Sequence, residues 1–253
     1  MIGGLVRKGL FYILVIIIWE VASELSLWPS FLLPSPAEVL QTLVEGFSDK
    51  TFVFGIVASL RRILIGYFIS VFAGVLLGLA IGRNRFLKET VGSLILGLQT
   101  LPSVCWLPLA LLWFGLNDSA IIFVVIMGAL LSITIATETG IRNVPPLLLR
   151  AGRNMGASGA QLLLEVAIPA ALPSIISGMK QGWSFAWRSL MAGELLYGSV
   201  GLGNLLMVGR ELNEMSQVLA VMLIIVLIGL CIDHLVFAIL EGEMRRRWGL
   251  ETG

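Results

Sequence analysis

The sequence predicts an all-α polytopic membrane protein, because of its apolar composition, its few charges and the length of its apolar runs. Of the 253 residues, 57% are apolar and a further 28 are glycine, well above the roughly 45–50% that is usual for soluble domains. Charged residues make up 13%, about half the usual share, and the mean hydropathy is +0.95. This composition excludes a cytosolic enzyme, a disordered chain and a secreted disulfide scaffold.

Six apolar runs are long enough to cross about 30 Å of hydrocarbon as helices. Strands of a membrane barrel are shorter, at about 10 residues, and alternate in polarity. We therefore expect six transmembrane helices, with the first run kept as an uncleaved span because no small-residue cleavage site follows it. The runs are Gly9–Trp28, Ile63–Gly82, Thr90–Asn117, Ser119–Thr137, Leu172–Tyr197 and Met215–Ile232.

Lysine and arginine residues in the loops predict the orientation of these spans. With the N-terminus inside, 11 of the 17 basic residues fall on the inner side, and four fall on the outer side. Both termini are therefore expected in the cytoplasm. The four outer residues are Lys50, Arg61, Arg62 and Arg210.

Between the first two spans, the sequence predicts a short amphipathic helix on the outer surface. Ser35 is suited to cap this helix and Pro36 to occupy its first position. Apolar residues then recur at helical spacing from Leu40 to Phe47.

The third run contains two prolines, Pro102 and Pro108. Each proline removes a backbone donor and tends to kink a helix. A break at membrane depth persists only where protein or a water-filled cavity satisfies the freed backbone groups. The two prolines therefore predict either a plain packing kink or a gating kink, and the sequence leaves both open.

A segment of some 30 residues, from Arg142 to about Pro173, is far longer than the other inner loops. Pro145 and Pro146 suit a helix start, and Gly156 suits its end. Ser158 can cap a second helix, which we expect Pro169 to end. The sequence thus predicts a helix–turn–helix, which either binds a partner or packs on its own bundle.

This loop resembles the motif E-A-A-x3-G-x9-I-x-L-P of ABC importer permeases. The glycine and proline of the motif match Gly156 and Pro169 at the same spacing, whereas Arg150 replaces the glutamate and Gly152 the second alanine. The resemblance implies that this loop couples the permease to an ATPase. The residues concerned are Arg150, Ala151, Gly152, Arg153, Gly156, Val166, Ile168 and Pro169.

Further segments, in order along the chain, are similar to the nitrate, sulfonate, taurine and bicarbonate branch of these permeases. They are LPSP at 33–36, SLRR at 59–62, GLAIGRN at 78–84, LPSVCWLPLALLWFGLND at 101–118, ATETGIR at 136–142, GLG at 201–203 and the tail formed by Asp233, Glu241 and Trp248.

The resemblance implies a type I ABC importer permease architecture and a single transmembrane domain over residues 1–253. Residues 1–58 are expected to form the first span and the outer helix. Residues 59–242 form a five-helix core with the coupling loop at 142–172, and 243–253 form a cytoplasmic tail. The implied function is import of a small anion or organic acid, such as nitrate, a sulfonate, taurine or bicarbonate, across a bacterial-type inner membrane.

The resemblance also implies the partners. They are a second permease subunit, most simply a copy of this chain, two ATP-binding cassette subunits and an extracytoplasmic substrate-binding protein. The chain has no G-x4-G-K-[ST] phosphate loop, so ATP and Mg are expected on the ATPase subunits. We expect no cofactor, metal site or catalytic residue in this chain, because the two cysteines lie in apolar runs and His234 is the only histidine. A net charge of +1 gives no bulk attraction to nucleic acid.

Polar residues in the fifth span form one stripe at helical spacing and predict a lining for the translocation path. The candidates are Ser177, Lys180, Ser184 and Arg188, together with Glu194. A cationic stripe suits an anionic substrate. Two alternatives remain: Lys180 can extend to the inner interface, and Arg188 can be neutralised by Glu138 or by Glu194 of the partner subunit.

A secondary carrier or channel working without an ATPase is the alternative function. Such carriers often show paired inverted repeats with broken helices in matching positions. This sequence has one proline-broken span and no internal repeat. A membrane enzyme is disfavoured, because no nucleophile, base and metal ligands occur together.

Overall fold

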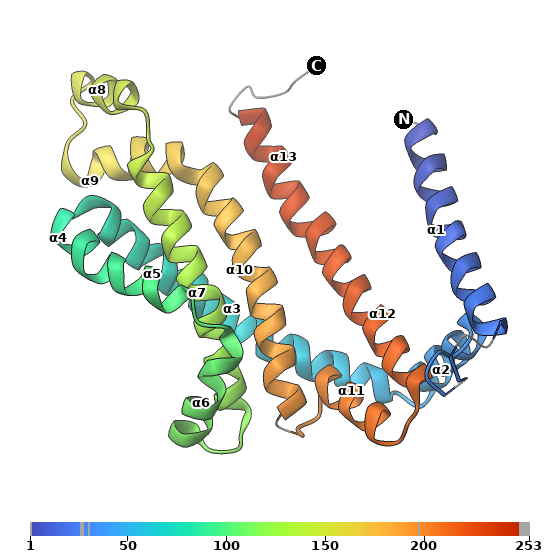
Figure 1. The fold of residues 1–253 in the computed structure, drawn as a ribbon. Coiled ribbons are helices and arrows are strands. Elements are labelled where there is room, and N and C mark those ends of the chain that lie inside the picture. Colours follow the sequence, from blue (N-terminus) through green and yellow to red (C-terminus); the bar gives the residue numbers. More distant parts are fainter. Residues whose placement is uncertain (1, 26–27, 30, 197, 248–253) are drawn as a thin grey trace. The chain divides into compact units, whose positions relative to one another are not determined.

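The computed structural model describes residues 2–25, 28–29, 31–196 and 198–247, and within these ranges the chain forms helices and no strands (Figure 1). The all-α prediction is confirmed. The expected span end at Tyr197 and the tail residue Trp248 lie outside the described residues. The chain divides into two compact units, one of Met1–Ser59 with Tyr197–Ile228 and the other of Leu60–Leu196 with Gly229–Gly253.

The first unit contains the predicted outer helix. Its helices are α1 (Ile2–Glu24), α2 (Pro36–Ser48), the start of α3 (Thr51–Arg83), α11 (Leu202–Glu211) and most of α12 (Met215–Ile232). The Ser35 side chain accepts a hydrogen bond from the Glu38 N–H, and the Glu38 carboxylate accepts one from the Ser35 N–H. This capping box confirms the helix start predicted at Ser35 and Pro36.

The start of α3 packs against α11. The Ser59 hydroxyl is buried and accepts a hydrogen bond from the Leu202 N–H at 2.9 Å. A Cβ atom at Gly55 would lie 2.7 Å from Leu205 Cδ1, so a larger residue would require this leucine to move. Both contacts lie within the first unit.

In the second unit, α7 (Asp118–Arg142) is the central helix, and α3 and α10 (Ile168–Leu196) both contact it. Gly74, Gly78 and Gly82 recur every four residues on α3 and bring its backbone against α7. A Cβ atom at Gly74 would lie 3.1 Å from Ile133, and one at Gly182 of α10 would lie 2.7 Å from the same side chain. Such spacing of small residues permits close helix packing in membranes.

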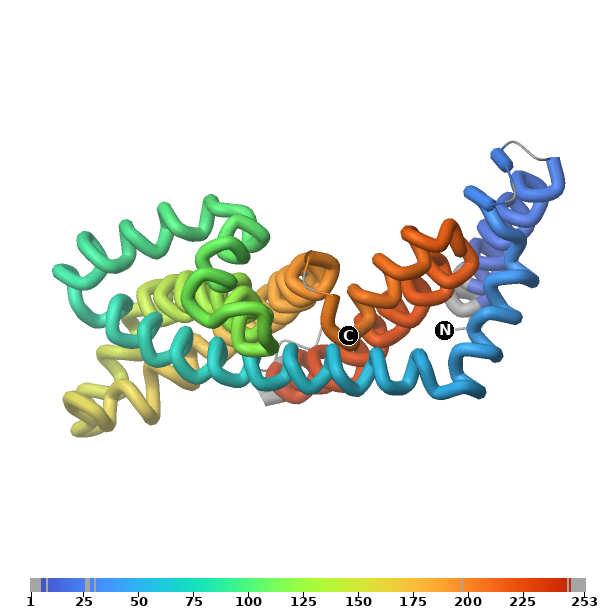
Figure 2. The backbone as a smooth tube through the Cα atoms, turned by 90° about the horizontal axis from the view of Figure 1, so that it is seen from below, coloured from blue at the N-terminus to red at the C-terminus, as the bar shows by residue number. Residues whose placement is uncertain are grey.

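The third predicted span is broken rather than kinked. It consists of α4 (Arg85–Leu87), η1 (Lys88–Gly92), α5 (Ser93–Gln99), η2 (Ser103–Trp106) and α6 (Leu107–Phe114). Its two halves meet at 104°, and the turn is visible between α5 and α6 in Figures 1 and 2. Pro102 lies at this break. Pro108 produces no kink, because it lies in the first turn of α6, where a missing N–H leaves no helical bond unmade.

The predicted pair of loop helices is present as α8 (Pro146–Asn154) and α9 (Gly159–Leu162). The expectation that Pro169 ends the second helix is wrong. A helix runs without interruption from Gly159 to Leu196 through η3 (Leu163–Ala167) and α10. The wide π-turn of η3 ends at Ala167, two residues before Pro169, and accommodates a residue that lacks an N–H and crowds the preceding turn.

Four helices among the described residues are long and apolar enough to cross a membrane, and the bent pair makes a fifth. They include α12 extended by η4 (Asp233–Phe237) and α13 (Ala238–Arg247). Six spans were predicted from the sequence. The difference is α1, which corresponds to the first predicted span and is not among these helices.

Candidate functional site

Helix α8 presents an exposed surface at one end of the second unit. Leu147 is 75% exposed and Met155 is 87% exposed, and the side chains of Arg150 and Arg153 are exposed beside them. Large apolar side chains that face outward next to cations are typical of a surface that binds another protein.

Two glycines determine where α8 lies. A Cβ atom at Gly152 would be 2.9 Å from Val166 Cγ2 and 3.0 Å from Leu162 Cδ1, so Gly152 lets α8 pack closely on the following helix. An alanine at this position would require the ends of the Val166 and Leu162 side chains to move. Gly156 has φ +93°, the left-handed region that glycine adopts without strain, which confirms the predicted sharp turn.

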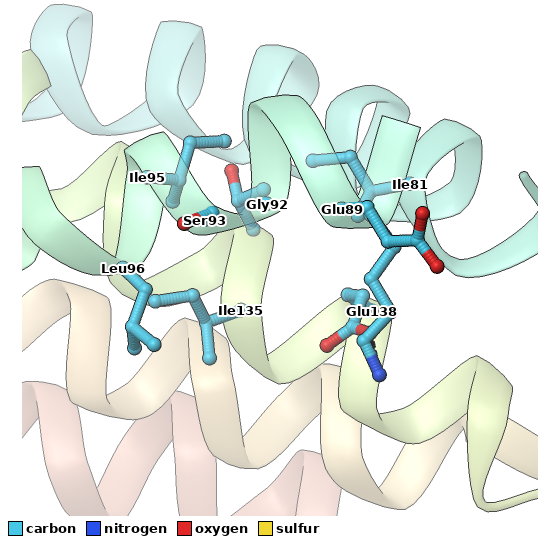
Figure 3. A pocket seen from close by; sticks show the side chains of 10 residues that line it. Ile81, Glu89, Gly92, Ser93, Ile95, Leu96, Ile135 and Glu138 are labelled. Atoms are coloured by element: carbon cyan, nitrogen blue, oxygen red, sulfur yellow. Dashed lines mark ion pairs between the residues drawn. The ribbon is translucent and has the colours of Figure 1, made fainter. Parts of the chain in front are cut away.

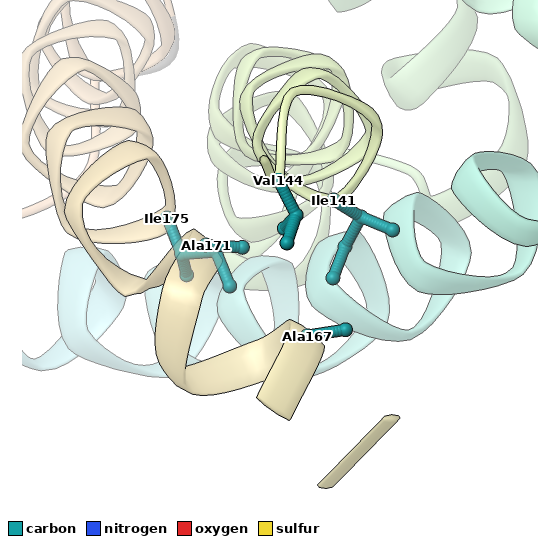
Figure 4. Packing of buried hydrophobic residues seen from close by; sticks show 5 residues of the cluster. All are labelled: Ile141, Val144, Ala167, Ala171 and Ile175. Carbon is teal, nitrogen blue, oxygen red and sulfur yellow. The ribbon is translucent and has the colours of Figure 1, made fainter. Parts of the chain in front are cut away.

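A buried apolar cluster holds the base of this loop (Figure 4). Its members come from the end of α7, from the turn that follows it, from η3 and from the start of α10, and Ile168 packs against them. Buried side chains at the base of the loop therefore hold α8 in place. The five cluster residues are Ile141, Val144, Ala167, Ala171 and Ile175.

Two hollows lie along one face of α10, where α7 and the break between α5 and α6 provide the opposite walls. Gln99 lines both. The first has a volume of about 340 Å³ and is lined by Gln99, Thr100, Leu101, Pro102, Ser103, Trp106, Met127, Gly128, Leu131, Phe185 and Arg188. The second has a volume of about 440 Å³ and is lined by Gln99, Ser132, Ile135, Ala136, Thr139, Pro173, Ser174, Ser177, Gly178 and Gln181.

The structure brings two of the predicted path residues, Arg188 and Ser177, to these hollows. The Arg188 side chain is exposed, and its guanidinium lies 5.3 Å from the centre of the Phe185 ring. No carboxylate in the described part of the chain pairs with Arg188. Glu138, which was one predicted partner, instead pairs with Arg142 at 3.4 Å. Ser184 is exposed but lines neither hollow.

Lys180 does not line these hollows. Its ammonium lies 2.7 Å from Asp233 Oδ1 and 3.5 Å from Glu241 Oε1, so it joins α10 to the helix that contains η4 and α13. Eight residues rotate an ideal α-helix about 80° beyond whole turns. The extra residue in the π-turn η4 removes most of that offset and brings both carboxylates to one face.

Glu194 does not line a path either, because its side chain has no exposed surface. It accepts a hydrogen bond from Arg62 Nη1 at 2.8 Å, and Arg62 Nη2 lies 2.8 Å from Asp118 Oδ1. The sequence analysis counted Arg62 among the outer loop cations, but only 5% of this residue is exposed. Arg62 and Asp118 both stand in segments that carried the family resemblance, and their pairing was missed.

A third hollow, of about 290 Å³, lies between α7 and the helices before the break (Figure 3). Its walls are largely apolar, and Glu89 and Glu138 lie together at one end. Glu138 is 4.0 Å from Lys88, so the acidic end of this hollow is partly neutralised. Within the described ranges, no group of three or more His, Cys, Asp or Glu side chains could hold a metal ion.

Comparison with known proteins gives a family and several relatives. The family of binding-protein-dependent transport system inner membrane components matches residues 70–246. A putative ABC transporter permease protein of Methanocaldococcus jannaschii is 34% identical over 87% of this chain and 84% of its own length. The taurine transport system permease protein TauC of Escherichia coli is 30% identical over 89% and 83%.

The nitrate import permease protein NrtB of Synechocystis is 29% identical over 81% of this chain and 78% of its own. Among solved structures, one of the MetNI methionine ABC transporter in an inward-facing conformation has a TM-score of 0.62, with 21% identity over 76% of this chain and 95% of that one. This similarity confirms the fold that the sequence analysis expected.

Proposed function

The chain belongs to the family of binding-protein-dependent transport system inner membrane components and is a permease subunit of an ABC importer, and we propose that its substrate is a small anion or organic acid. Relatives named for taurine and nitrate transport support this substrate class. So does Arg188, the one charged side chain that lines either hollow along α10.

The exposed surface of α8 is the observation that supports assembly with an ATPase. We assign its exposed residues Arg150, Ala151 and Arg153 to contact with an ATPase subunit, which binds ATP and Mg. Gly152 and Gly156 position this helix, and Val166, Ile168 and Pro169 fasten it to the bundle. Closure of the ATPase subunits would then move the attached helices as rigid bodies.

The remaining partners follow from the same assignment. Two copies of the chain would enclose the path, two ATPase subunits would dock on the cytoplasmic side, and an extracytoplasmic binding protein would deliver substrate on the other. The chain would then be a multi-pass inner membrane protein with both termini in the cytoplasm. Gating would occur at the break beside Pro102, where the two halves of the span meet.

Purification of the tagged chain from its native cells in mild detergent tests this proposal. Mass spectrometry should find a stoichiometric ATPase, and the reconstituted complex should take up taurine or nitrate only with ATP and a binding protein. Transport by the chain without any ATPase would favour the alternative, a secondary carrier or channel. Replacing both Leu147 and Met155 with serine should release the ATPase, whereas serine at Leu94, which is 61% exposed but lies on α5, should not.

A further inference from the structure

Arg188 occupies a position at which an arginine requires an anion or water. It lies eight residues before the end of α10, which is about 12 Å along the helix axis. Helical side chains lean toward the N-terminus of their helix, so the guanidinium is directed away from the near end of α10. A bare guanidinium facing lipid at such a depth costs several kcal/mol.

Neighbouring groups of this chain leave the charge of Arg188 uncompensated. In the part of the chain that the structure describes, it makes no ion pair, and its contact is the face of Phe185. Stacking on an aromatic face restricts the plane of a guanidinium without occupying its N–H donors. The five donors therefore remain free to bind oxygen atoms in the first hollow.

The broken span supplies neutral donors to the same hollow. The Gln99 amide and the Ser103 hydroxyl both line it, and neither forms a hydrogen bond with another described residue. Thr100 is less suited, because its hydroxyl donates to Gly97 O at 2.7 Å. A continuous helix would carry Gln99 and Ser103 past the hollow, whereas the 104° break holds them at its wall.

The second hollow differs in its chemistry. Hydroxyl and amide groups line it, and no charged side chain does. One of these hydroxyls belongs to Ser132, which is 3% exposed and whose Oγ has no hydrogen-bond partner among the described residues. A polar but uncharged wall attracts an anion only weakly. The strongest attraction for an anion therefore lies at Arg188 in the first hollow.

We propose that Arg188, Gln99 and Ser103 form an oxyanion-binding subsite in the wall of the translocation path. Its ligand is the sulfonate, carboxylate or nitrate group of the transported solute, which binds through two oxygens to the guanidinium. Gln99 and Ser103 donate to the third oxygen of a sulfonate or nitrate, or to the unused lone pairs of a carboxylate. The subsite selects anions over neutral and cationic solutes, and it rests on the proposed function as a permease for small anions.

Charge-selective cysteine labelling tests the subsite without knowledge of the substrate. Ser103→Cys is introduced into the complex after Cys105 and Cys231 are replaced with alanine. The thiol is then reacted with a sulfonate-bearing and a trimethylammonium-bearing methanethiosulfonate, each rate being divided by that for free mercaptoethanol. We expect a preference of about tenfold or more for the anionic reagent. Taurine or nitrate should slow its reaction.

Variants at Arg188 provide the decisive comparison. Arg188→Leu and Arg188→Gln should remove the preference and the protection, whereas Arg188→Lys should keep most of both. Arg61→Leu, which removes an exposed arginine that lines neither hollow, should change nothing. A thiol at Ser177 in the uncharged second hollow should show a weaker preference.

Equal reaction of both reagents at position 103, with Arg188 in place, would overturn the subsite. So would a preference that persists in both Arg188→Leu and Arg188→Gln. Neither result depends on the ATPase, whose absence after purification would instead contradict the proposed function. In reconstituted complexes, ATP-driven taurine or nitrate uptake should fall by about tenfold or more in Arg188→Leu, while complex assembly stays unchanged.

Discussion

The guanidinium of Arg62 lies 2.8 Å from the carboxylate of Glu194, a side chain with no exposed surface. The same guanidinium lies 2.8 Å from Asp118, at the start of α7. One cation thus joins α3, α7 and α10 at the same end of the second unit. Glu194 and Arg188 share α10 but have different roles. Glu194 forms an ion pair with Arg62 of the same chain, whereas Arg188 is available to bind a ligand.

Arg62→Leu should destabilise the protein strongly, because it removes the guanidinium that lies 2.8 Å from the buried Glu194 carboxylate. The expected loss in the free energy of unfolding is about 3–5 kcal/mol. It should appear as a lower temperature of aggregation in detergent. Asp118→Asn is the matched control, and we expect a smaller loss because the Asp118 side chain is 43% exposed. The double variant Arg62→Leu with Glu194→Leu should recover part of the stability, and a double variant weaker than Arg62→Leu would contradict this account.

The pair between Lys180 and Asp233 should stabilise the contact between α10 and the last helix. Lys180→Met alone is expected to cost up to about 1 kcal/mol, since the Lys180 and Asp233 side chains are 37% and 43% exposed and water screens the lost pair. Adding Asp233→Asn should restore part of the loss. Arg85→Met removes an ion pair to Glu89 whose side chains are 91% and 61% exposed, and it should have almost no effect on thermal stability.

Gly156→Asp should uncouple transport or abolish assembly with the ATPase. Nothing lies within 4 Å of a Cβ atom at this position, so the cause would be the left-handed backbone rather than a clash. Gly156→Val should be worse, by about 1–2 kcal/mol, because a branched side chain tolerates this conformation poorly. Gly229→Ala, in a helix with equal open space, is the control, and normal ATP-driven uptake in Gly156→Asp would refute the role of the loop.

Gly152→Leu should push α8 away from the following helix and weaken ATPase binding about tenfold or more. The physical cause is a clash with Val166 and Leu162, whose side chains would lie 2.9 and 3.0 Å from a Cβ atom at this position. Because these are the ends of flexible side chains, Val166→Ala should rescue the variant in part. Co-purification of the ATPase measures both effects, and a lack of rescue would show that bulk at this contact is not the cause.

Structural features that depend on neighbouring residues were predicted correctly. The capping box of α2 depends on Ser35 and Glu38, which are three residues apart, and the turn at Gly156 depends on one backbone angle. Long apolar runs predicted membrane helices because each helix satisfies its own backbone hydrogen bonds. The helix end predicted at Pro169 was wrong, because the π-turn η3 just before this proline lets the helix continue through it.

The amino-acid sequence alone was enough to predict an all-α membrane protein, its family resemblance and the position of the two loop helices α8 and α9, since these depend on composition and on short spacings. The partners of the charged residues required the fold. Arg62 and Glu194 are 132 positions apart, and Asp233 reaches Lys180 through a register shifted by a π-turn. Opposite charges attract through space rather than along the chain, so only the packed helices distinguish a paired charge from the free one at Arg188.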